Sequence, residues 1–176
     1  MTVKKANQQL MFLRCNLRKC PSKLKANSYQ VYVKPILSYA SSVWNPIGTA
    51  GQGLRTQLEM VQRKAARFFN SDWSWESSPR QMMSDLNWRS LELVRKINNI
   101  VLLYRMVHGM IGNPPTFLPK RSRDGTKFQP VYGRVNTYRG SFVPSTVLRW
   151  NETPKELLKS GNINVFRKKI LKFLSS

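Results

Sequence analysis

Apolar residues recur at every third or fourth position over most of this chain, a period typical of amphipathic helices. Residues 3–20 carry the first such stripe, and Pro21 ends it. A second helix is predicted for residues 22–43, with the hydroxyl of Ser22 as its N-cap. Because Pro35 removes a backbone donor inside this helix, we expect a kink between residues 31 and 35. The first stripe comprises Val3, Ala6, Leu10, Leu13 and Leu17.

The second predicted helix has a mixed face that includes two tyrosines. Because Tyr32, Tyr39 and the following Trp44 lie on or next to an apolar face, we interpret them as core residues rather than as platforms for stacking bases. The glycines at positions 48, 51 and 53 predict a flexible connector, since no Lys-Ser or Lys-Thr pair of a phosphate loop follows them. The whole face comprises Leu24, Ser28, Tyr32, Ile36 and Tyr39.

A third helix is predicted for residues 54–70, and three helices of this kind close a small bundle by packing their stripes together. Ser78 and Pro79 then begin a short helix that ends near residue 86, and Ser90 caps a longer helix to about residue 108. The buried face of the third helix is expected to comprise Leu54, Leu58, Val61, Ala65 and Phe68. That of the longer helix comprises Leu91, Val94, Ile97, Val101 and either Tyr104 or Leu102.

The periodic pattern disappears in residues 113–143, where Pro, Gly, Lys and Arg dominate and only short extended pieces are expected. It returns in residues 144–150, after Thr153-Pro154, and in a final helix capped by Asn162 or Asn164. These elements predict a mainly α protein. We expect a three-helix bundle in residues 1–70, a further helical pair in residues 71–112, and an irregular basic segment with short helices in residues 113–176.

The net charge of the chain indicates an anionic partner, which the helical pattern alone does not. Thirty Lys and Arg against eight Asp and Glu give a formal net charge of +22 on 176 residues. The first 58 residues hold nine basic residues and no acidic one. Since such self-repulsion disfavours a compact chain unless a polyanion screens it, we expect nucleic acid as the partner, with an anionic membrane surface as the less favoured alternative.

Basic side chains on helix faces contact phosphates without reading base sequence. The cluster of Arg63, Lys64 and Arg67 on the third predicted helix suits this task, because its members lie three and four residues apart. The acid-free first third supplies further candidates. The candidate nucleic-acid-binding residues are Arg14, Arg18, Lys19, Lys23, Lys25, Lys34, Arg63, Lys64 and Arg67.

Catalytic and metal chemistry find little support in the sequence. Cys15, Cys20 and the single His108 lack the paired short spacings of a zinc site, so we interpret both cysteines as buried reduced thiols. Asp72 and Glu76 are better explained as salt-bridge partners of nearby arginines than as a metal-binding pair. We therefore expect neither a catalytic residue, a metal site nor a cofactor in this chain.

No targeting segment is apparent. The first nine residues lack the apolar core of a signal peptide, and the run at residues 100–104 is far too short to span a bilayer. We expect an intracellular protein of the nucleus or cytoplasm. The basic group of Lys120, Arg121 and Arg123 is more simply explained as a solvated loop than as a nuclear import signal.

Three groups of short motifs occur in a familiar order. The first contains residues 5–7 (KAN), 13–17 (LRCNL) and 32–46 (YVKPILSYASSVWNP). The second contains residues 58–68 (LEMVQRKAARF) and 86–91 (LNWRSL), and the third contains residues 141–146 (SFVPST), Trp150-Asn151 and Phe166-Arg167. Together they resemble the C-terminal part of reverse transcriptases from non-LTR (LINE-type) retrotransposons of the jockey-like group. The resemblance covers nearly the whole chain.

This resemblance implies a fragment of an RNA-directed DNA polymerase that holds the thumb and the segment behind it. In the full-length family an endonuclease domain often precedes the polymerase, and the palm holds Mg²⁺ on paired aspartates; this sequence has no Asp-Asp pair. Two departures, Ser38 in the first motif and Glu152 after Trp150-Asn151, suggest a diverged copy of a transposable element. The expected function is non-catalytic binding of a template–primer, whether RNA, RNA–DNA hybrid or DNA.

A second function class stays open. The helices could form a structural module that docks on the missing palm, which is the rest of the reverse transcriptase, or on a partner protein. The basic surface would then be incidental, and an isolated fragment would expose the apolar face that its neighbour covers. We do not expect a membrane as the partner, because the charges are spread over many elements rather than over one amphipathic helix.

Overall fold

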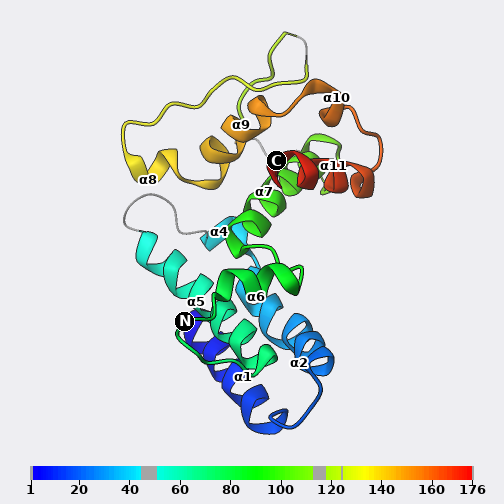
Figure 1. Cartoon of the computed structure of the whole chain (residues 1–176). Coiled ribbons are helices and arrows are strands. Elements are labelled where there is room, and N and C mark those ends of the chain that lie inside the picture. The colour runs from blue at the N-terminus through cyan, green and yellow to red at the C-terminus, as the bar shows by residue number, and fades with distance from the viewer. Residues whose placement is uncertain (1, 45–50, 113–117, 124, 176) are drawn as a thin grey trace. The chain divides into compact units, whose positions relative to one another are not determined.

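The computed structural model describes residues 2–44, 51–112, 118–123 and 125–175 (Figure 1). It confirms the mainly α class: within those ranges the regular elements are helices, and the only β pairing is an isolated antiparallel bridge. The chain forms two compact units. Unit 1 comprises Met1–Ala40 and Gly51–Val94, and unit 2 comprises Ser41–Ala50 and Arg95–Ser176.

This division follows contacts rather than composition. The predicted boundary at residue 70 falls inside unit 1, because α6 and the residues behind it pack on the helices before them. The predicted boundary at residue 112 falls inside unit 2. Each unit is described on its own below.

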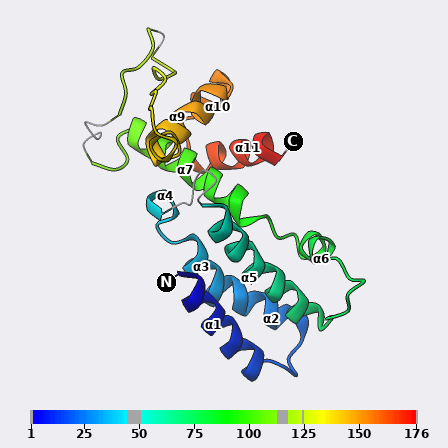
Figure 2. The ribbon, with the colours of Figure 1, turned by 90° about the vertical axis from the view of Figure 1, so that its left-hand side faces the viewer.

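Unit 1 consists of α1 (Thr2–Asn16), α2 (Ser22–Ser28), the π-helical turn η1 (Tyr29–Val33), α3 (Lys34–Ser38), α5 (Gln52–Asn70), α6 (Pro79–Asp85) and the first residues of α7 (Leu91–Val107). Helix α1 packs against both α3 and α5, and α2 also contacts α5 (Figure 2). Leu10, Val33, Leu58 and Phe69 are buried between these elements. Burial of their apolar stripes holds the unit together, because apolar area removed from water is the main favourable term in folding.

The second predicted helix is wrong in two respects. Tyr32 and Tyr39, predicted as core, are 55% and 80% exposed, whereas Tyr29, Val33 and Leu37 are fully buried. A four-residue spacing drifts by about 40° per step on a regular α-helix, and the wider π turn at η1 offsets that drift. The buried face thus keeps the predicted four-residue spacing but lies one residue later along the chain, and Lys25, before η1, already belongs to it.

The same segment does not continue as one helix to residue 43. The backbone of Tyr39 is extended and Ala40 has a φ of 47°, which ends α3 before the short helix α4 (Ser41–Trp44) of unit 2 begins. The kink expected between residues 31 and 35 corresponds to the change from η1 to α3, with Pro35 in the first turn of α3. The side chain of Trp44 and the glycine at position 48 lie outside the described residues.

Helix α5 agrees closely with its prediction in length but only partly in its buried face. Leu58, Val61, Ala65 and Phe68 are buried as expected, but Leu54 is 39% exposed. The predicted stripe extends one turn too far toward the N-terminus because the neighbouring helices do not cover that turn. In α7, Val94 and Val101 are likewise half-buried rather than buried; the buried side chains there include Leu91, Ile97, Ile100, Leu103 and Tyr104.

The predicted N-caps have different outcomes. Ser22 does not cap α2; its hydroxyl donates to the carbonyl oxygen of Phe69 at 2.9 Å. Ser78 occupies the N-cap position of α6 without a side-chain hydrogen bond. The Ser90 cap is confirmed, since its Oγ accepts a hydrogen bond from the backbone N–H of Leu93 at 3.2 Å.

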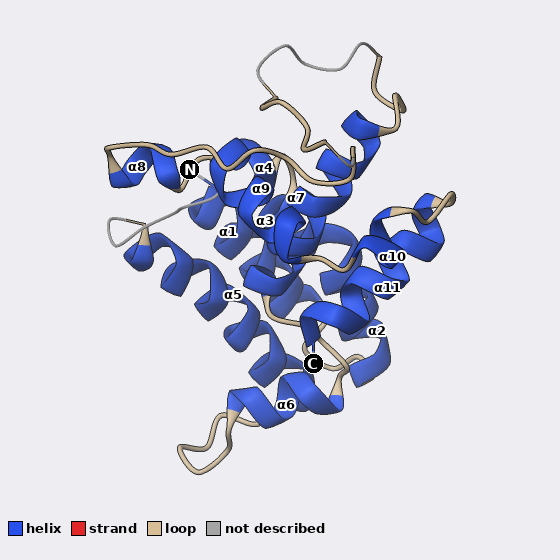
Figure 3. Ribbon diagram, turned by 90° about the horizontal axis from the view of Figure 1, so that it is seen from above, coloured by secondary structure: helices blue, strands red, loops and turns tan. Residues whose placement is uncertain are grey.

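Unit 2 contains α4, most of α7, α8 (Asn136–Arg139), α9 (Phe142–Glu152), α10 (Lys155–Leu158) and α11 (Ile163–Ser175). In Figure 3 the helices are blue and the loops that join them are tan. An aromatic group forms the centre of the unit: the ring of Tyr104 stacks on Phe166 with centroids 4.1 Å apart, and Trp150 lies beside both. The hydroxyl of Tyr104 donates to the carbonyl oxygen of Ser160, and burial raises its pKa above the ordinary tyrosine value.

The last helix begins where the sequence predicted. Asn162 is its N-cap, since its Oδ1 accepts a hydrogen bond from the backbone N–H of Asn164 at 2.8 Å. Phe166 and Ile170 are fully buried, whereas Val165 is 44% and Phe173 37% exposed. The predicted stripe is therefore correct at its centre and too wide at its edges.

Candidate nucleic-acid interface

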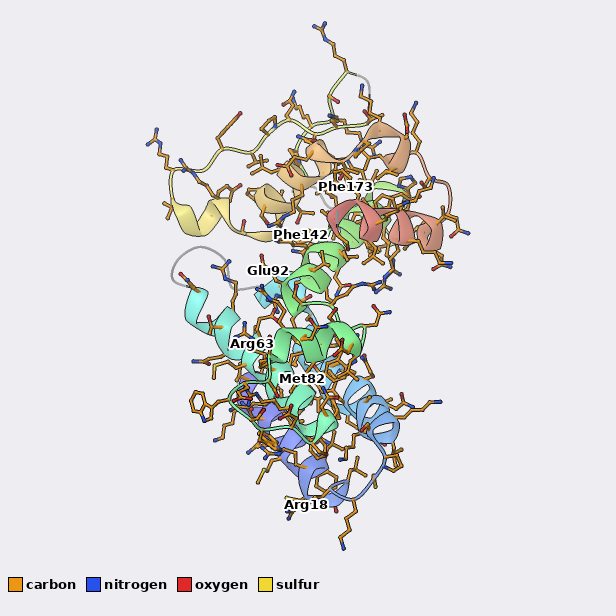
Figure 4. The ribbon with its side chains drawn as sticks, in the orientation of Figure 1. Arg18, Arg63, Met82, Glu92, Phe142 and Phe173 are labelled. Carbon is orange, nitrogen blue, oxygen red and sulfur yellow. The ribbon has the colours of Figure 1, made fainter. Side chains whose placement is uncertain are left out.

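The outer face of α5 presents Arg63 and Lys64, which are both exposed. The opposite face of the helix buries Leu58, Val61 and Ala65. Because the packing of that inner face fixes the rotation of the helix, the two cations are held pointing away from the core. Figure 4 labels Arg63 on α5 and Arg18 just beyond the end of α1.

Arg67, the third member of the predicted cluster, has a different role. Its guanidinium donates to the carbonyl oxygens of Ser74 at 3.2 Å and Ser77 at 3.5 Å. The side chain therefore holds the loop that follows α5, residues 71–78. Its two terminal guanidinium nitrogens donate to backbone carbonyl oxygens of this loop. The structure thus brings two of the three cluster residues to the outer face.

Lys25 is also bound within unit 1. It is only 4% exposed, and its Nζ donates to Ser71 Oγ at 3.2 Å while lying 5.0 Å from the ring centroid of Phe68. An ammonium group next to an aromatic face is stabilised by the ring quadrupole. The prediction that Lys25 contacts phosphate is inconsistent with this burial, which arises because one residue of helical register turns the side chain toward α5.

Arg14 makes a third connection to the same loop. Its guanidinium carbon lies 4.5 Å from the ring centroid of Trp73, and the side chain is half-buried. Arg14, Lys25 and Arg67 therefore reach loop residues 71–78 from three different helices. This loop was missed by sequence reasoning, because no local signal indicates that distant cations converge on it.

The loop carboxylate of Asp72 has a specific electrostatic setting. It accepts hydrogen bonds from the hydroxyl of Ser77 and from the backbone N–H of Ser74, the latter at 2.9 Å. These bonds, with a smaller contribution from the charge of Arg67, lower the pKa of Asp72 below its ordinary value. The expected pairing of Asp72 with a nearby arginine is thus mainly a set of serine contacts.

The remaining candidates are distributed over two places. Arg18, Lys19 and Lys23 are exposed around the connection between α1 and α2. Lys34 is half-buried and donates to Gln30 Oε1 at 2.8 Å, one turn earlier. The exposed candidates are therefore Arg18, Lys19, Lys23, Arg63 and Lys64, whereas Arg14, Lys25, Lys34 and Arg67 have intramolecular partners.

Acidic residues in unit 1 are few, and three of them, Glu59, Asp72 and Asp85, accept hydrogen bonds within the unit. The unit carries 14 basic and five acidic residues. Glu59 accepts hydrogen bonds from the backbone N–H groups of Leu91 at 3.3 Å and Glu92 at 2.9 Å, so its carboxylate lies at the positive end of α7. Asp85 accepts from Gln81 Nε2 at 2.9 Å. These carboxylates stabilise local structure, and the unit keeps a net positive field.

The two cysteines are less buried than the sequence indicated. Cys15 is exposed and Cys20 half-buried, both with free thiols, so the prediction of two buried thiols is wrong. Cys20 lies beyond α1, which ends four residues earlier. His108 stacks on Tyr104 with ring centroids 3.9 Å apart. Over the described ranges, no three His, Cys, Asp or Glu side chains gather closely enough to hold a metal ion.

Comparisons with known proteins leave the family open. No protein-family model, no curated protein and no solved structure matches this chain. In the part of the chain that the structure describes, no helix has both the length and the apolar character needed to cross a bilayer. The assignment of function therefore depends on the residues and their geometry.

Proposed function

We propose that this chain is a non-catalytic, nucleic-acid-binding helical fragment that holds a phosphate backbone through exposed basic side chains. The observation that carries the proposal is the placement of Arg63 and Lys64 on the outer face of a helix whose inner face is packed. Phosphate contacts of this kind give affinity and a fixed position without base specificity. The motif resemblance to non-LTR reverse transcriptases extends the proposal to a polymerase thumb that grips a template–primer.

Lack of catalysis is part of the proposal. A two-metal nucleotidyl transferase needs carboxylates that converge from rigid elements, and the sequence contains no Asp-Asp pair of the kind that the palm of these polymerases uses. We expect the purified chain to leave an annealed primer unextended when deoxynucleotides and Mg²⁺ are added. Extension would refute this part of the proposal.

The binding test uses the full chain with three fluorescent probes: an RNA–DNA hybrid, duplex DNA and hairpin RNA. Affinity is measured over a series of salt concentrations. The logarithm of the association constant should fall linearly with the logarithm of salt, with a slope of about 0.9 per phosphate neutralised on duplex DNA. Weak binding that does not change with salt on all three probes would refute the proposal.

A double variant tests the α5 surface directly. Arg63→Glu with Lys64→Glu should lower affinity for every probe at least about tenfold, because two phosphate contacts become repulsive. Arg80→Glu with Arg89→Glu is the matched control, since both arginines are exposed in unit 1 and the charge change is the same. Equal losses in the two variants would indicate long-range charge rather than a contact on α5.

The alternative, a module that docks on another domain or protein, is favoured by one observation. Met11 and Phe12, neighbours on the outward face of α1, are 56% and 60% exposed. If another domain or protein covers these two side chains in the complex, the isolated chain should self-associate in high salt. Salt screens the repulsion between the positively charged chains, so that the exposed apolar side chains can meet. Met11→Glu with Phe12→Glu should then remove the self-association without lowering the melting temperature, as seen by light scattering and calorimetry.

A further inference from the structure

Residues 120–123 and 125–129 in unit 2 are the described parts of a basic hairpin, called hairpin 120–129 below. The backbone N–H of Gln129 donates to Lys120 O at 2.9 Å, and the N–H of Ser122 donates to Lys127 O at 2.8 Å. Arg121 and Phe128 form the isolated antiparallel bridge between these two bonds. The turn contains Gly125 with a φ of 66°, a left-handed conformation that glycine adopts without strain.

Two adjacent residues at the end of α9 attach this hairpin to the unit. Asn151 bonds the backbone of Phe128 in both directions: its Oδ1 accepts from the N–H at 3.0 Å and its Nδ2 donates to the carbonyl oxygen at 2.8 Å. The indole N–H of Trp150 donates to Thr126 O at 2.9 Å. The side-chain amide of Asn151 thus makes the pair of hydrogen bonds with Phe128 that the backbone of an adjacent β-strand would make.

The other arm and the base are held as well. The guanidinium of Arg121 donates to Val107 O at 3.2 Å and to Gly125 O at 3.4 Å. Phe128 is 4% exposed, and its ring centroid lies 6.0 Å from that of Trp150. The hairpin is therefore tied down by side-chain hydrogen bonds and by one buried ring, unlike the solvated basic loop that the sequence suggested.

The hairpin also carries cations that take no part in the anchoring contacts described above. Lys120 and Arg123 are exposed and Lys127 is half-buried. Because hydrogen bonds hold the two arms of the hairpin, a ligand that binds these cations avoids part of the entropy loss of ordering a loop.

We propose that hairpin 120–129 is a second phosphate-contacting element of this protein, with the nucleic-acid backbone as its ligand. Lys120 and Arg123 contact the phosphates, and Asn151 and Trp150 are positioning residues that hold the hairpin. The inference rests on the proposed nucleic-acid binding and adds a separate site in unit 2. An anionic membrane is disfavoured, because the large apolar ring of the hairpin, Phe128, is buried and leaves no anchor to insert into lipid.

The test compares two double variants of the full chain with equal loss of charge. Lys120→Ala with Arg123→Ala should lower affinity for duplex DNA about tenfold and reduce the salt slope by about 1.8, which corresponds to two phosphate contacts. Lys168→Ala with Lys169→Ala is the matched control on α11, where both lysines are exposed in the same unit. The control should lose less than about threefold, with the salt slope nearly unchanged.

Asn151→Ala tests the positioning role. In the otherwise unchanged chain it should lower affinity by about threefold or more, because the cations lose their fixed backbone. In the Lys120→Ala, Arg123→Ala background it should cause no further loss. A further loss in that background, with the far-UV circular dichroism unchanged, would overturn the assigned role of Asn151.

The outcomes separate this inference from the proposed function. If the α5 variant weakens binding but Lys120→Ala with Arg123→Ala does not, the hairpin proposal is wrong and the proposed function stands. Equal losses in the hairpin pair and the α11 control also overturn it. If the unchanged chain shows no salt-dependent binding at all, both proposals fail. Binding to phosphatidylserine vesicles that needs Lys120 and Arg123, with nucleic-acid affinity unchanged, would assign the hairpin to a membrane surface instead.

Discussion

The ring of Tyr29 stacks on the indole of Trp88, with centroids 4.4 Å apart and planes inclined by 21°. Phe69 meets both rings edge-on, at 5.8 Å from Tyr29 and 4.9 Å from Trp88. The three rings come from η1, from the end of α5 and from the segment behind α6. This aromatic trio thus connects segments of unit 1 that lie far apart in the sequence.

Removal of one ring from this trio should destabilise unit 1. Trp88→Ala is expected to lower the free energy of unfolding by about 3 kcal/mol, because it leaves a cavity against Tyr29 and Phe69. Trp75→Ala is the matched control, since Trp75 is fully exposed and its loss should change stability by less than about 0.5 kcal/mol. Urea unfolding followed by circular dichroism measures both. Similar effects of the two substitutions would contradict the aromatic core.

Tyr29 has a buried hydroxyl with no hydrogen-bond partner among the described residues, and burial with the nearby charge of Glu59 raises its pKa well above the ordinary value. A raised pKa means that the folded state favours the protonated phenol. The stability associated with it is therefore complete below pH 10, the ordinary tyrosine value, and is lost as the pH rises beyond that.

Tyr29→Phe removes the orphan hydroxyl and should leave stability at neutral pH equal or raise it by up to about 1 kcal/mol. It should also make unit 1 less sensitive to alkali. Thermal unfolding of both proteins between about pH 9 and pH 11 checks this. A variant that is less stable at neutral pH and equally sensitive to alkali would contradict the finding that the Tyr29 hydroxyl is buried without a hydrogen-bond partner among the described residues.

Two leucines of α5 distinguish the predicted stripe from the observed one. Leu58 is fully buried, so Leu58→Ala should lower the free energy of unfolding by about 2–5 kcal/mol. Leu54 is 39% exposed, so Leu54→Ala should have a much smaller effect, below about 1 kcal/mol. Chemical denaturation of the two variants measures both changes in the free energy of unfolding. Equal losses of unfolding free energy in the two variants would support the longer buried face that the sequence predicted, which includes Leu54.

The N-cap of α11 offers a local test. Asn162→Ala should destabilise the helix by about 1 kcal/mol, because the N–H of Asn164 loses its acceptor. Asn164→Ala keeps that N–H and its acceptor, so it is the matched control and should be close to neutral. The melting temperature of each variant is measured by calorimetry, and a larger effect of Asn164→Ala would place the cap elsewhere.

The loop behind α5 should respond to acid through Asp72. Its pKa is lowered by the hydrogen bonds from Ser77 and Ser74, so the associated stability is present above the ordinary carboxyl pKa and is lost as the pH falls through the lowered value. Ser77→Ala removes the largest cause and should move the pKa back toward the ordinary value. Titration of the Asp72 carboxyl by NMR measures the change, and an unchanged midpoint would contradict the assigned cause.

The exposed tyrosines show where local pattern fails. Tyr32 was expected in the core from its spacing to Ser28 and Ile36, but the adjacent face of the helix, with Tyr29 and Val33, is the buried one. Replacement of Tyr32 should therefore affect stability little. The residue pattern predicts that a helix forms here, but it does not decide which of two adjacent faces is buried, because that depends on what the helix packs against.

The candidate nucleic-acid interface shows the same limit of local pattern. Charge and spacing were sufficient to identify Arg63 and Lys64 as exposed cations on α5. They could not predict that Lys25 bonds Ser71, 46 residues away, or that Arg67 turns back to the loop. Nor could they reveal that Asn151 holds Phe128 and fixes a basic hairpin.

The sequence by itself determined the helical class, most helix positions, the cap at Ser90, two candidates for the cap of the last helix, and the excess of positive charge. These depend on neighbours within a few residues and on composition. Only the tertiary structure decided which cations remain exposed and which hold loops. That choice depends on contacts between distant residues, because a cation is buried when a carbonyl, hydroxyl or aromatic face from another element replaces its water.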